Sequence, residues 1–270
     1  MELLKETISD TFLIIPILFI MYICLEYFEH KEYSFYEKYL LKYGPLLGAG
    51  LGMIPQCGFG VLASVLFIEN KITLGTLISV FIATSDEAIP ILIAHPQMYA
   101  SLIYIIILKF LLAIIIGYFI DYFFKKQKNY SLKDYGHKHN HSIFIEAILR
   151  TVKIYSFIFI TNLLLSYLIE TIGLHNLSII LMNNSMFQPL ACAIIGFIPN
   201  CASSVILTQL YINHVLSFAS LLAGLMTNAG LGILVLLQNK IDTKTILKIC
   251  VILLISALIV NLPLQWFYLH

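Results

Sequence analysis

The hexapeptide GMIPQC at residues 52–57 recurs as GFIPNC at residues 196–201, at an offset of 144 residues. Several apolar residues that follow each hexapeptide match at the same offset, and after one gap Thr84 meets Thr227. Proline has no backbone N–H and interrupts a helix, so each copy predicts a break inside an otherwise apolar stretch. The chain is therefore expected to contain an internal repeat whose two copies are both broken at a Pro-x-Cys motif.

The composition of the chain indicates a membrane protein. Its 270 residues are 60% hydrophobic and 11% charged, and the mean hydropathy is +0.90, whereas a soluble domain carries about 25% charged residues. The formal net charge of +1 is unlike that of a basic nucleic-acid-binding protein, so no nucleic-acid partner is expected. The five cysteines lie in or beside apolar stretches, which argues against a secreted disulfide-rich domain. We therefore predict an all-α polytopic membrane protein.

Apolar stretches long enough to cross the bilayer, which takes about 20 residues, mark the expected spans. Four are simple, at residues 11–28, 98–124, 154–169 and 245–267, and two are interrupted by polar clusters, at residues 72–94 and 216–237. The stretches around the repeated hexapeptides, residues 44–68 and 186–212, can each be one interrupted span or a re-entrant hairpin of two half-length helices.

The distribution of lysine and arginine favours the hairpins, because these residues concentrate in cytoplasmic loops. With two simple spans, the chain would cross eight times and its lysines would be divided between both sides. With two re-entrant hairpins, the lysines at residues 31–42 and 240–248 join the cluster at residues 125–138 on one side, together with Arg150. This topology places both termini outside and the central loop in the cytoplasm.

Each repeat then consists of a span, a hairpin, a broken span and a further span. Three full crossings are an odd number, so the second copy is expected to be inverted relative to the first. We predict a first inverted repeat at residues 1–124, a cytoplasmic histidine-bearing linker at residues 125–145 and a second inverted repeat at residues 146–270. Inverted repeats whose broken helices meet near the middle of the bilayer are typical of secondary transporters.

The sequence around the breaks resembles a known family. IPQCGF at residues 54–59 with SVFIATSDEAIP at residues 79–90 resembles the first signature of the ten-transmembrane heavy-metal exporters, and IPNCASSV at residues 198–205 with AGLMT at residues 223–227 resembles the second. The family is named for its likeness to arsenic permeases, and its members are also labelled manganese transporters. The resemblance covers nearly the whole chain and implies a transporter of metal or metalloid ions. Unlike the family pattern, the histidine-bearing loop has no cysteine.

Two adjacent carboxylates in the first broken span, Asp86 and Glu87, are the strongest candidates for transport chemistry. An ionisable residue at bilayer depth costs about 2.5 kcal/mol or more and marks an ion or proton pathway. Beside Thr84 and Ser85, the pair offers hard oxygen ligands for a divalent cation, and one carboxyl group can instead carry a proton for coupling. The alternative is a static ion pair with Lys109, near the middle of the next span.

Cysteine and amide side chains repeat at both hairpin breaks, as Gln56-Cys57 and Asn200-Cys201. Thiolates are soft ligands that suit zinc, cuprous copper or arsenite rather than manganese, although a lone membrane cysteine is usually an apolar packing residue. The helices that start at the breaks direct unpaired N–H groups toward the same place, which suits an anion as well. The remaining candidates for substrate binding are in the second repeat: Ser204, Thr227 and Asn228.

The loop between the repeats carries three histidines at alternate positions, His137, His139 and His141. Such a cluster can share a metal ion in a flexible loop, and a cytoplasmic loop is a sensible place for an exporter to capture its cargo. Neighbouring lysines oppose a cation there, so a solvated linker with incidental histidines is the competing interpretation.

These observations predict a secondary transporter that exports a heavy-metal or metalloid ion, manganese-like or arsenite, across the plasma membrane, with protons or another ion as the coupling partner. No Gly-rich, Lys-bearing nucleotide loop occurs in the sequence, and no nucleophile–base pair or His/Glu metal motif lies within a span, so neither an enzyme nor a bound cofactor is expected. A small organic anion transporter and a passive ion channel are the alternatives. A homo-oligomer is compatible with the sequence.

Overall fold

The computed structural model describes residues 34–55, 58–85, 88–124, 185–239 and 241–269, with isolated positions at 19 and between 148 and 160. Within these ranges, the structure describes only the backbone of residues 34–42, 201, 268 and 269. Apart from these isolated positions, the predicted spans at residues 11–28 and 154–169 and the predicted linker at residues 125–145 lie outside the described residues.

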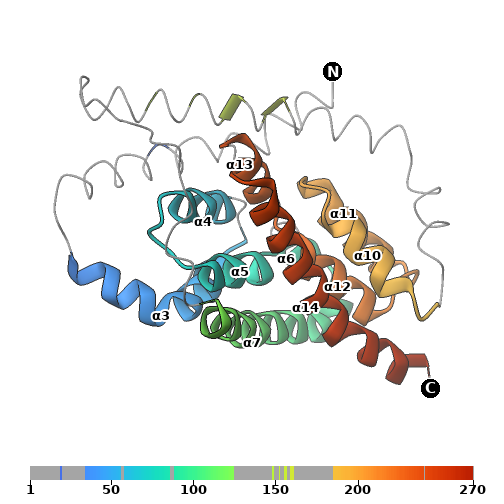
Figure 1. Cartoon of the computed structure of the whole chain (residues 1–270). Helices are drawn as coiled ribbons and strands as arrows, with labels where there is room; N and C mark the ends of the chain where they lie inside the picture. The colour runs from blue at the N-terminus through green and yellow to red at the C-terminus, as the bar shows by residue number, and fades with distance from the viewer. Residues whose placement is uncertain are drawn as a thin grey trace.

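Every regular element in the described part of the chain is a helix (Figure 1), which confirms the all-α prediction for these residues. The first half contains α3 (Ser34–Gly52), α4 (Gly58–Ile68), α5 (Leu74–Ala83), α6 (Ala88–Ile93), the 3-10 helix η1 (Pro96–Met98) and α7 (Tyr99–Phe123). The second half contains α10 (Gln188–Gly196), α11 (Cys201–Ile212), α12 (Phe218–Thr227), α13 (Gly232–Gln238) and α14 (Thr243–Leu269). In each half, two helices separated by the Pro-containing break precede a broken helix and a long helix.

Within the residues that the structure describes, four helical segments are long and apolar enough to cross a membrane, which supports a multi-span membrane protein. They are Leu74–Ile93, Pro96–Phe123, Phe218–Gln238 and Thr243–Phe267. They coincide with the predicted spans at residues 72–94, 98–124, 216–237 and 245–267. Three of the four helices beside the Pro-x-Cys breaks are shorter: α4 has 11 residues, α10 has 9 and α11 has 12. The longest of these three is about 18 Å long, against the roughly 30 Å of a bilayer core, whereas α3 has 19 residues.

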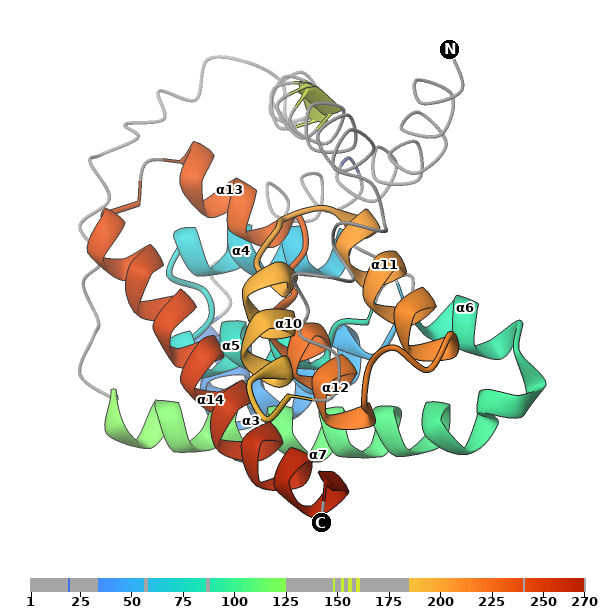
Figure 2. The ribbon, with the colours of Figure 1, turned by 90° about the vertical axis from the view of Figure 1, so that its right-hand side faces the viewer.

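The two halves use the same helix contacts. In the first half α5 packs between α3 and α7, and in the second half α12 packs between α10 and α14. The halves also interlock, because α4 packs against α13 and α11 packs against α6, on opposite sides of the molecule in Figure 2. The broken helices α5 and α12 contact each other between these two pairs. The described residues therefore form two units with matching contacts and a common interior.

The turns after α4 and α11 also match in backbone conformation. Asn70 and His214, which are 144 residues apart, both have a positive φ, at 57° and 58°. In each turn the amide of the next residue donates to the carbonyl oxygen five residues back, at 2.8 Å after α4 and 2.9 Å after α11. A left-handed residue with such a backward hydrogen bond is a common helix C-cap. Each cap ends its helix and directs the chain into the broken helix that follows.

The glycine that opens each repeated hexapeptide permits close packing of two helices. A Cβ atom on Gly52 would lie 2.7 Å from the carbonyl oxygen of Val80 on α5, and a Cβ atom on Gly196 would collide with the carbonyl of Gly224 on α12. Val80 and Gly224 are again 144 residues apart. Helix packing therefore explains why glycine stands at both positions.

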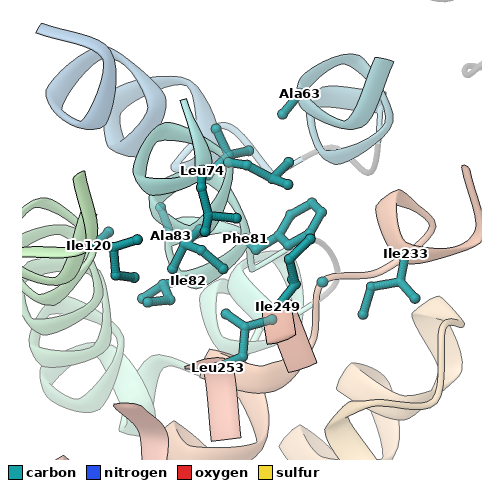
Figure 3. Packing of buried hydrophobic residues seen from close by; sticks show 14 of the residues in the cluster. Ala63, Leu74, Phe81, Ile82, Ala83, Ile120, Ile233, Ile249 and Leu253 are labelled. Carbon is teal, nitrogen blue, oxygen red and sulfur yellow. The ribbon is translucent and has the colours of Figure 1, made fainter. Parts of the chain in front are cut away.

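A shared hydrophobic core joins the two halves (Figure 3). Phe81 on α5 is fully buried, and its cluster includes Ala63 on α4 and Ile120 on α7 from the first half. The same cluster includes Ile233 on α13 and Leu253 on α14 from the second half. Neither half completes this core without the other.

Candidate functional site

The first helix break lies between the end of α5 at Ala83 and the start of α6 at Ala88, where the sequence is TSDE and the described residues are Thr84 and Ser85. Helix α5 ends at Ala83, and Thr84 caps it with a non-helical backbone conformation, φ −58° and ψ 131°. The Thr84 hydroxyl donates to the carbonyl oxygen of Val80 at 2.7 Å, so this hydroxyl is used within its own helix. Thr84 and Ser85 are both buried. The break therefore begins inside the protein.

Lys109 on α7 brings its ammonium group to this break. The side chain is fully buried, and Nζ donates to the hydroxyl of Ser85 at 2.5 Å and to the carbonyl oxygen of Leu225 on α12 at 2.9 Å. A third hydrogen bond goes to the carbonyl oxygen of Thr84. Lys109 therefore connects the break in the first half with the end of α12 in the second half.

The location of these oxygens contributes to compensating the buried charge of Lys109. Removing a charged group from water costs several kcal/mol unless hydrogen bonds and opposite charge compensate. Thr84 lies at the end of α5 and Leu225 lies in the last turn of α12. At helix ends of this kind, carbonyl groups lack intrahelical partners and the helix dipole presents partial negative charge. The ends of both broken helices together stabilise the Lys109 ammonium.

The second break, at residues 228–231, is shaped by its own side chains. Asn228 caps α12, and its Oδ1 accepts a hydrogen bond from the amide of Gly230 at 3.0 Å. Gly230 has a positive φ of 53°, which glycine adopts without strain. The Thr227 hydroxyl donates to the carbonyl oxygen of Ala193 on α10 at 2.8 Å. Thr227 thus holds α12 against α10, while Asn228 shapes the turn.

The second Pro-x-Cys motif starts α11. Asn200 is the N-cap, and its Oδ1 accepts from the amide of Ala202 at 3.1 Å, as is common for asparagine at the start of a helix. Cys201 is the first residue of α11. The carbonyl of Ser204, a buried residue, accepts from the Thr208 hydroxyl at 2.7 Å. These contacts place the predicted residues of this motif in the α10–α11 pair.

The structure brings together part of the predicted site. Thr84, Ser85 and Lys109 meet in one hydrogen-bonded group, and Thr227 lies in the same last turn of α12 as Leu225, which joins that group. Several further predicted site residues lie outside the described part of the chain: Gln56, Cys57, Asp86, Glu87, His137, His139, His141 and the side chain of Cys201. Among the residues that the structure describes, no group of three or more His, Cys, Asp or Glu side chains could hold a metal ion. The metal ligands, and the ion pair with Lys109, stay predictions.

The sequence interpretation missed polar clusters at the starts of the broken helices. Asp121 on α7 accepts hydrogen bonds from the amide of Gly75 at 2.8 Å and from the Thr73 hydroxyl at 2.7 Å, at the start of α5. In the second half, Gln265 on α14 accepts a hydrogen bond from the hydroxyl of Ser217, at the start of α12. Asp121 and Gln265, like Thr73 and Ser217, are 144 residues apart. A repeat comparison that allowed similar polar residues to match would have found them.

A buried glutamine ties α10 to the start of α12. The Gln188 side chain accepts from the amide of Ser217 at 3.1 Å and from the Ser220 hydroxyl at 2.8 Å. Its Nε2 donates to the carbonyl oxygen of Val215 at 3.0 Å. The first residue of α10 therefore lies beside the residues that follow α11.

Comparison with known proteins identifies one family. Two overlapping segments of the chain, residues 1–149 and 139–267, match a family model described as "putative, 10TM heavy-metal exporter". Together the two segments cover nearly the whole chain. No curated protein and no solved structure matches the chain.

Proposed function

Because the chain belongs to this family of heavy-metal exporters, we propose that it is a secondary transporter that exports a heavy-metal or metalloid ion across the plasma membrane. The observation that carries the proposal is the meeting of two broken helices, α5–α6 and α12–α13, around the buried ammonium of Lys109. Interrupted helices at bilayer depth are tolerated where they are buried or line a cavity. Secondary transporters bind their ions at such interruptions.

If the two halves are inverted relative to each other, the matching helices α7 and α14 run in opposite directions, so the end of α7 lies near the start of α14. The ring of Phe124, just after α7, has its centroid 3.7 Å from the ammonium of Lys248 near the start of α14, although α7 and α14 occupy the same place in their halves. At the other end, the hydroxyl of Ser101 near the start of α7 bonds to the hydroxyl of Tyr211 near the end of α11, at 2.7 Å. This opposite course of α7 and α14 supports two inverted repeats with the predicted boundaries.

The helices α10 and α11 form a pair that we assign as a re-entrant hairpin. A straight helix from residue 188 to residue 217 would be about 43 Å long, yet the side chain of Gln188 bonds to the amide of Ser217 at 3.1 Å. The pair is thus expected to enter and leave the bilayer on one side. We assign α3 and α4 in the same way, because Gly44 on α3 contacts Thr76 at the start of α5.

Charge decides which end of the molecule we assign to the cytoplasm. Lys71 lies two residues before Thr73, which bonds to Asp121 near the end of α7. Lys248 lies beside the residue that follows α7. Because lysines concentrate on the cytoplasmic side, this end and the 125–145 linker are assigned to the cytoplasm, with both termini outside.

The cargo site is proposed at the central break, where Asp86 and Glu87 follow Thr84 and Ser85 in the chain. Carboxylate and hydroxyl oxygens suit a hard or borderline divalent cation such as manganese, whereas the cysteines of the two Pro-x-Cys motifs suit arsenite or zinc. Two carboxylates within the membrane are costly to retain for a neutral arsenic hydroxide, so we favour a manganese-like cation. One of the two carboxyl groups is the proposed proton carrier.

Uptake into proteoliposomes that contain the purified full-length chain tests this function. Manganese, zinc and arsenite are compared with and without a proton gradient, in the parent protein and in Asp86→Asn and Glu87→Gln. We expect uphill transport of manganese that is lost in at least one of the two variants, because each removes a negative charge from the site. Full transport in both variants would remove the acidic pair from the mechanism, and transport that runs only downhill would identify a channel.

Serine substitutions separate a sulfur site from an oxygen site. If sulfur binds the cargo, Cys57→Ser and Cys201→Ser should each abolish transport of arsenite or zinc. For a manganese-like cargo held by oxygen we expect mild effects, because serine fills nearly the same volume as cysteine. A double variant that stays folded but loses all manganese transport would contradict the oxygen site.

A further inference from the structure

The hydrogen bonds of Lys109 bring oxygens from both halves to a single buried point. The Ser85 hydroxyl lies 2.5 Å from Nζ and the Leu225 carbonyl oxygen lies 2.9 Å from it, with the Thr84 carbonyl as the third acceptor. Lys109, Thr84 and Ser85 are all buried. An ammonium group therefore occupies a position that the protein has lined with oxygen.

These oxygens form the kind of ligand set that a free cation uses in a broken-helix transporter. Carbonyl groups at unwound backbone and at the C-terminal ends of half-helices coordinate the coupling ion in such proteins. Thr84 follows α5 and Leu225 is in the last turn of α12, so the same type of carbonyl surrounds Nζ here. The ammonium carries one positive charge, which is the charge of sodium or potassium.

We propose that Lys109 is a tethered cation: its ammonium fills a monovalent-cation site between the two halves and takes the place of a sodium or potassium ion there. The site then stays occupied without any dissolved cation, and the ends of α5 and α12 remain linked whatever the salt. The role of this link in transport rests on the proposed function, whereas the site itself rests on the contacts alone. It follows that the coupling ion of the exporter is not a sodium or potassium ion bound at this position.

The position of the second half that matches Lys109 carries no ammonium group, so the tethered cation comes from the first half alone. Leu253 on α14 lies 144 residues after Lys109, is fully buried and belongs to the hydrophobic core around Phe81 (Figure 3). A single ammonium thus serves the helix ends of both halves. Leu253 also provides a matched position at which a buried side chain can be shortened without removing a charge.

The proposal predicts that removing the tether creates a requirement for a dissolved cation. Lys109→Ala leaves the three oxygens in place, vacates the space of the side chain and lets sodium or potassium enter. Lys109→Met removes the charge but fills most of that space, so its stability should not depend on the cation.

Thermal unfolding of the purified full-length chain in detergent tests this prediction, in sodium, potassium and choline chloride at equal ionic strength. We expect the same Tm in all three salts for the parent protein. For Lys109→Ala we expect a Tm that sodium or potassium raises by about 5 °C or more at saturation, as mass action requires for a ligand of the folded state. Radioactive sodium or rubidium should bind to this variant at about one ion per chain and not to the parent protein at this site. Leu253→Ala should lose stability equally in all three salts.

The opposite outcomes overturn the proposal. A folded Lys109→Ala protein with one Tm in all three salts and no bound cation would show that the oxygens do not form a cation site. A Lys109→Ala protein that is unfolded in every salt would contradict the proposal too, because a dissolved cation should then replace the ammonium. A cation response of equal size in Lys109→Met would place the cation elsewhere. None of these readouts involves metal transport, so a parent protein that fails to transport metal would refute the proposed function and leave the tethered cation untouched.

Discussion

Gly52 and Gly196 set how closely each helix before a Pro-x-Cys break approaches the broken helix that it packs against. At both positions a Cβ atom would collide with a backbone carbonyl one helix away, on Val80 and on Gly224. Such contacts involve backbone on both sides, so no flexible side chain can move to relieve them. The packing of α3 on α5 and of α10 on α12 therefore requires glycine.

Gly196→Ala is expected to lower the free energy of unfolding by about 1–3 kcal/mol, the usual effect of overpacking an interior. Gly50→Ala is the matched control, because nothing lies within 4 Å of its added Cβ and alanine favours a helix over glycine by about 1 kcal/mol. Thermal unfolding of both variants in detergent measures the difference. Equal unfolding midpoints would show that α10 can move away from α12 without loss.

Asp121 stabilises the start of α5 through its two carboxylate oxygens. Asp121→Ala should reduce the free energy of unfolding by about 1–2 kcal/mol, the typical effect of losing a side-chain acceptor at a helix start. Asp121→Asn should retain most of that stability, because Gln265 performs the matching role in the second half without a charge. Denaturant or thermal unfolding distinguishes the two variants, and an asparagine variant as unstable as the alanine variant would show that the charge is required.

The residues of the site could be predicted where a polar side chain stands out in an apolar span. This applies to Thr84, Ser85 and Lys109, which the structure joins by hydrogen bonds. The Leu225 carbonyl could not be predicted, because a backbone acceptor has no sequence signature and becomes available only where its helix ends. Thr227 also stands out in the sequence, yet its hydroxyl bonds to a neighbouring helix. The sequence thus identifies a polar side chain within an apolar span, but not the group to which it bonds.

At the scale of elements, hydropathy predicted the four described spans and the interruptions within two of them. The alignment of the repeats needed one correction. Matching identical residues paired Thr84 with Thr227 across a gap, whereas the structure caps α5 with Thr84 and α12 with Asn228, which keeps the offset of 144 without a gap. The contacts of α4 with α13 and of α6 with α11 could not be predicted, since a single sequence carries no record of which apolar faces meet.

The proposed topology predicts which loops share a side of the membrane. Single cysteines placed at Lys71 and Lys244 of a cysteine-free chain should react with an impermeant thiol reagent from the cytoplasmic side, because the start of α5 and the start of α14 both lie near the end of α7. A cysteine at Asn213, which follows α11, should react from the opposite side, because α11 ends beside the start of α7. Labelling in intact cells and in inverted vesicles gives the result, and reaction of the two lysine positions from opposite sides would refute the hairpins.

At the scale of the whole molecule, the two halves depend on each other. Phe81 of the first half is buried in a cluster completed by α13 and α14, and the pairs α4–α13 and α6–α11 cross between the halves. Separation would expose this shared interior and leave α4 and α11 without the partners on which they pack. The folded state thus belongs to the full chain.

A chain divided within the 125–145 linker should reassemble only when both fragments are produced together. We expect residues 1–135 or 136–270 alone to aggregate or be degraded, and the co-expressed pair to co-purify as one species by size-exclusion chromatography. The uncut chain is the reference for its elution volume and its thermal unfolding midpoint. Either fragment behaving alone as a single species with that same midpoint would show that a half is self-sufficient.

Lys109 is charged and its counterpart Leu253 is apolar, although both are buried. This difference affects the relative free energies of the two end states of the proposed transport cycle. Two identical inverted units could exchange their conformations to give an inward-open and an outward-open state of equal free energy. For the inverted repeats and the transport cycle proposed above, a charge on one unit only makes the two states unequal in free energy, and we expect the protein at rest to populate them unequally. Because apparent affinity falls with the populated fraction of the binding-competent state, cargo should bind more tightly from one face of the membrane than from the other.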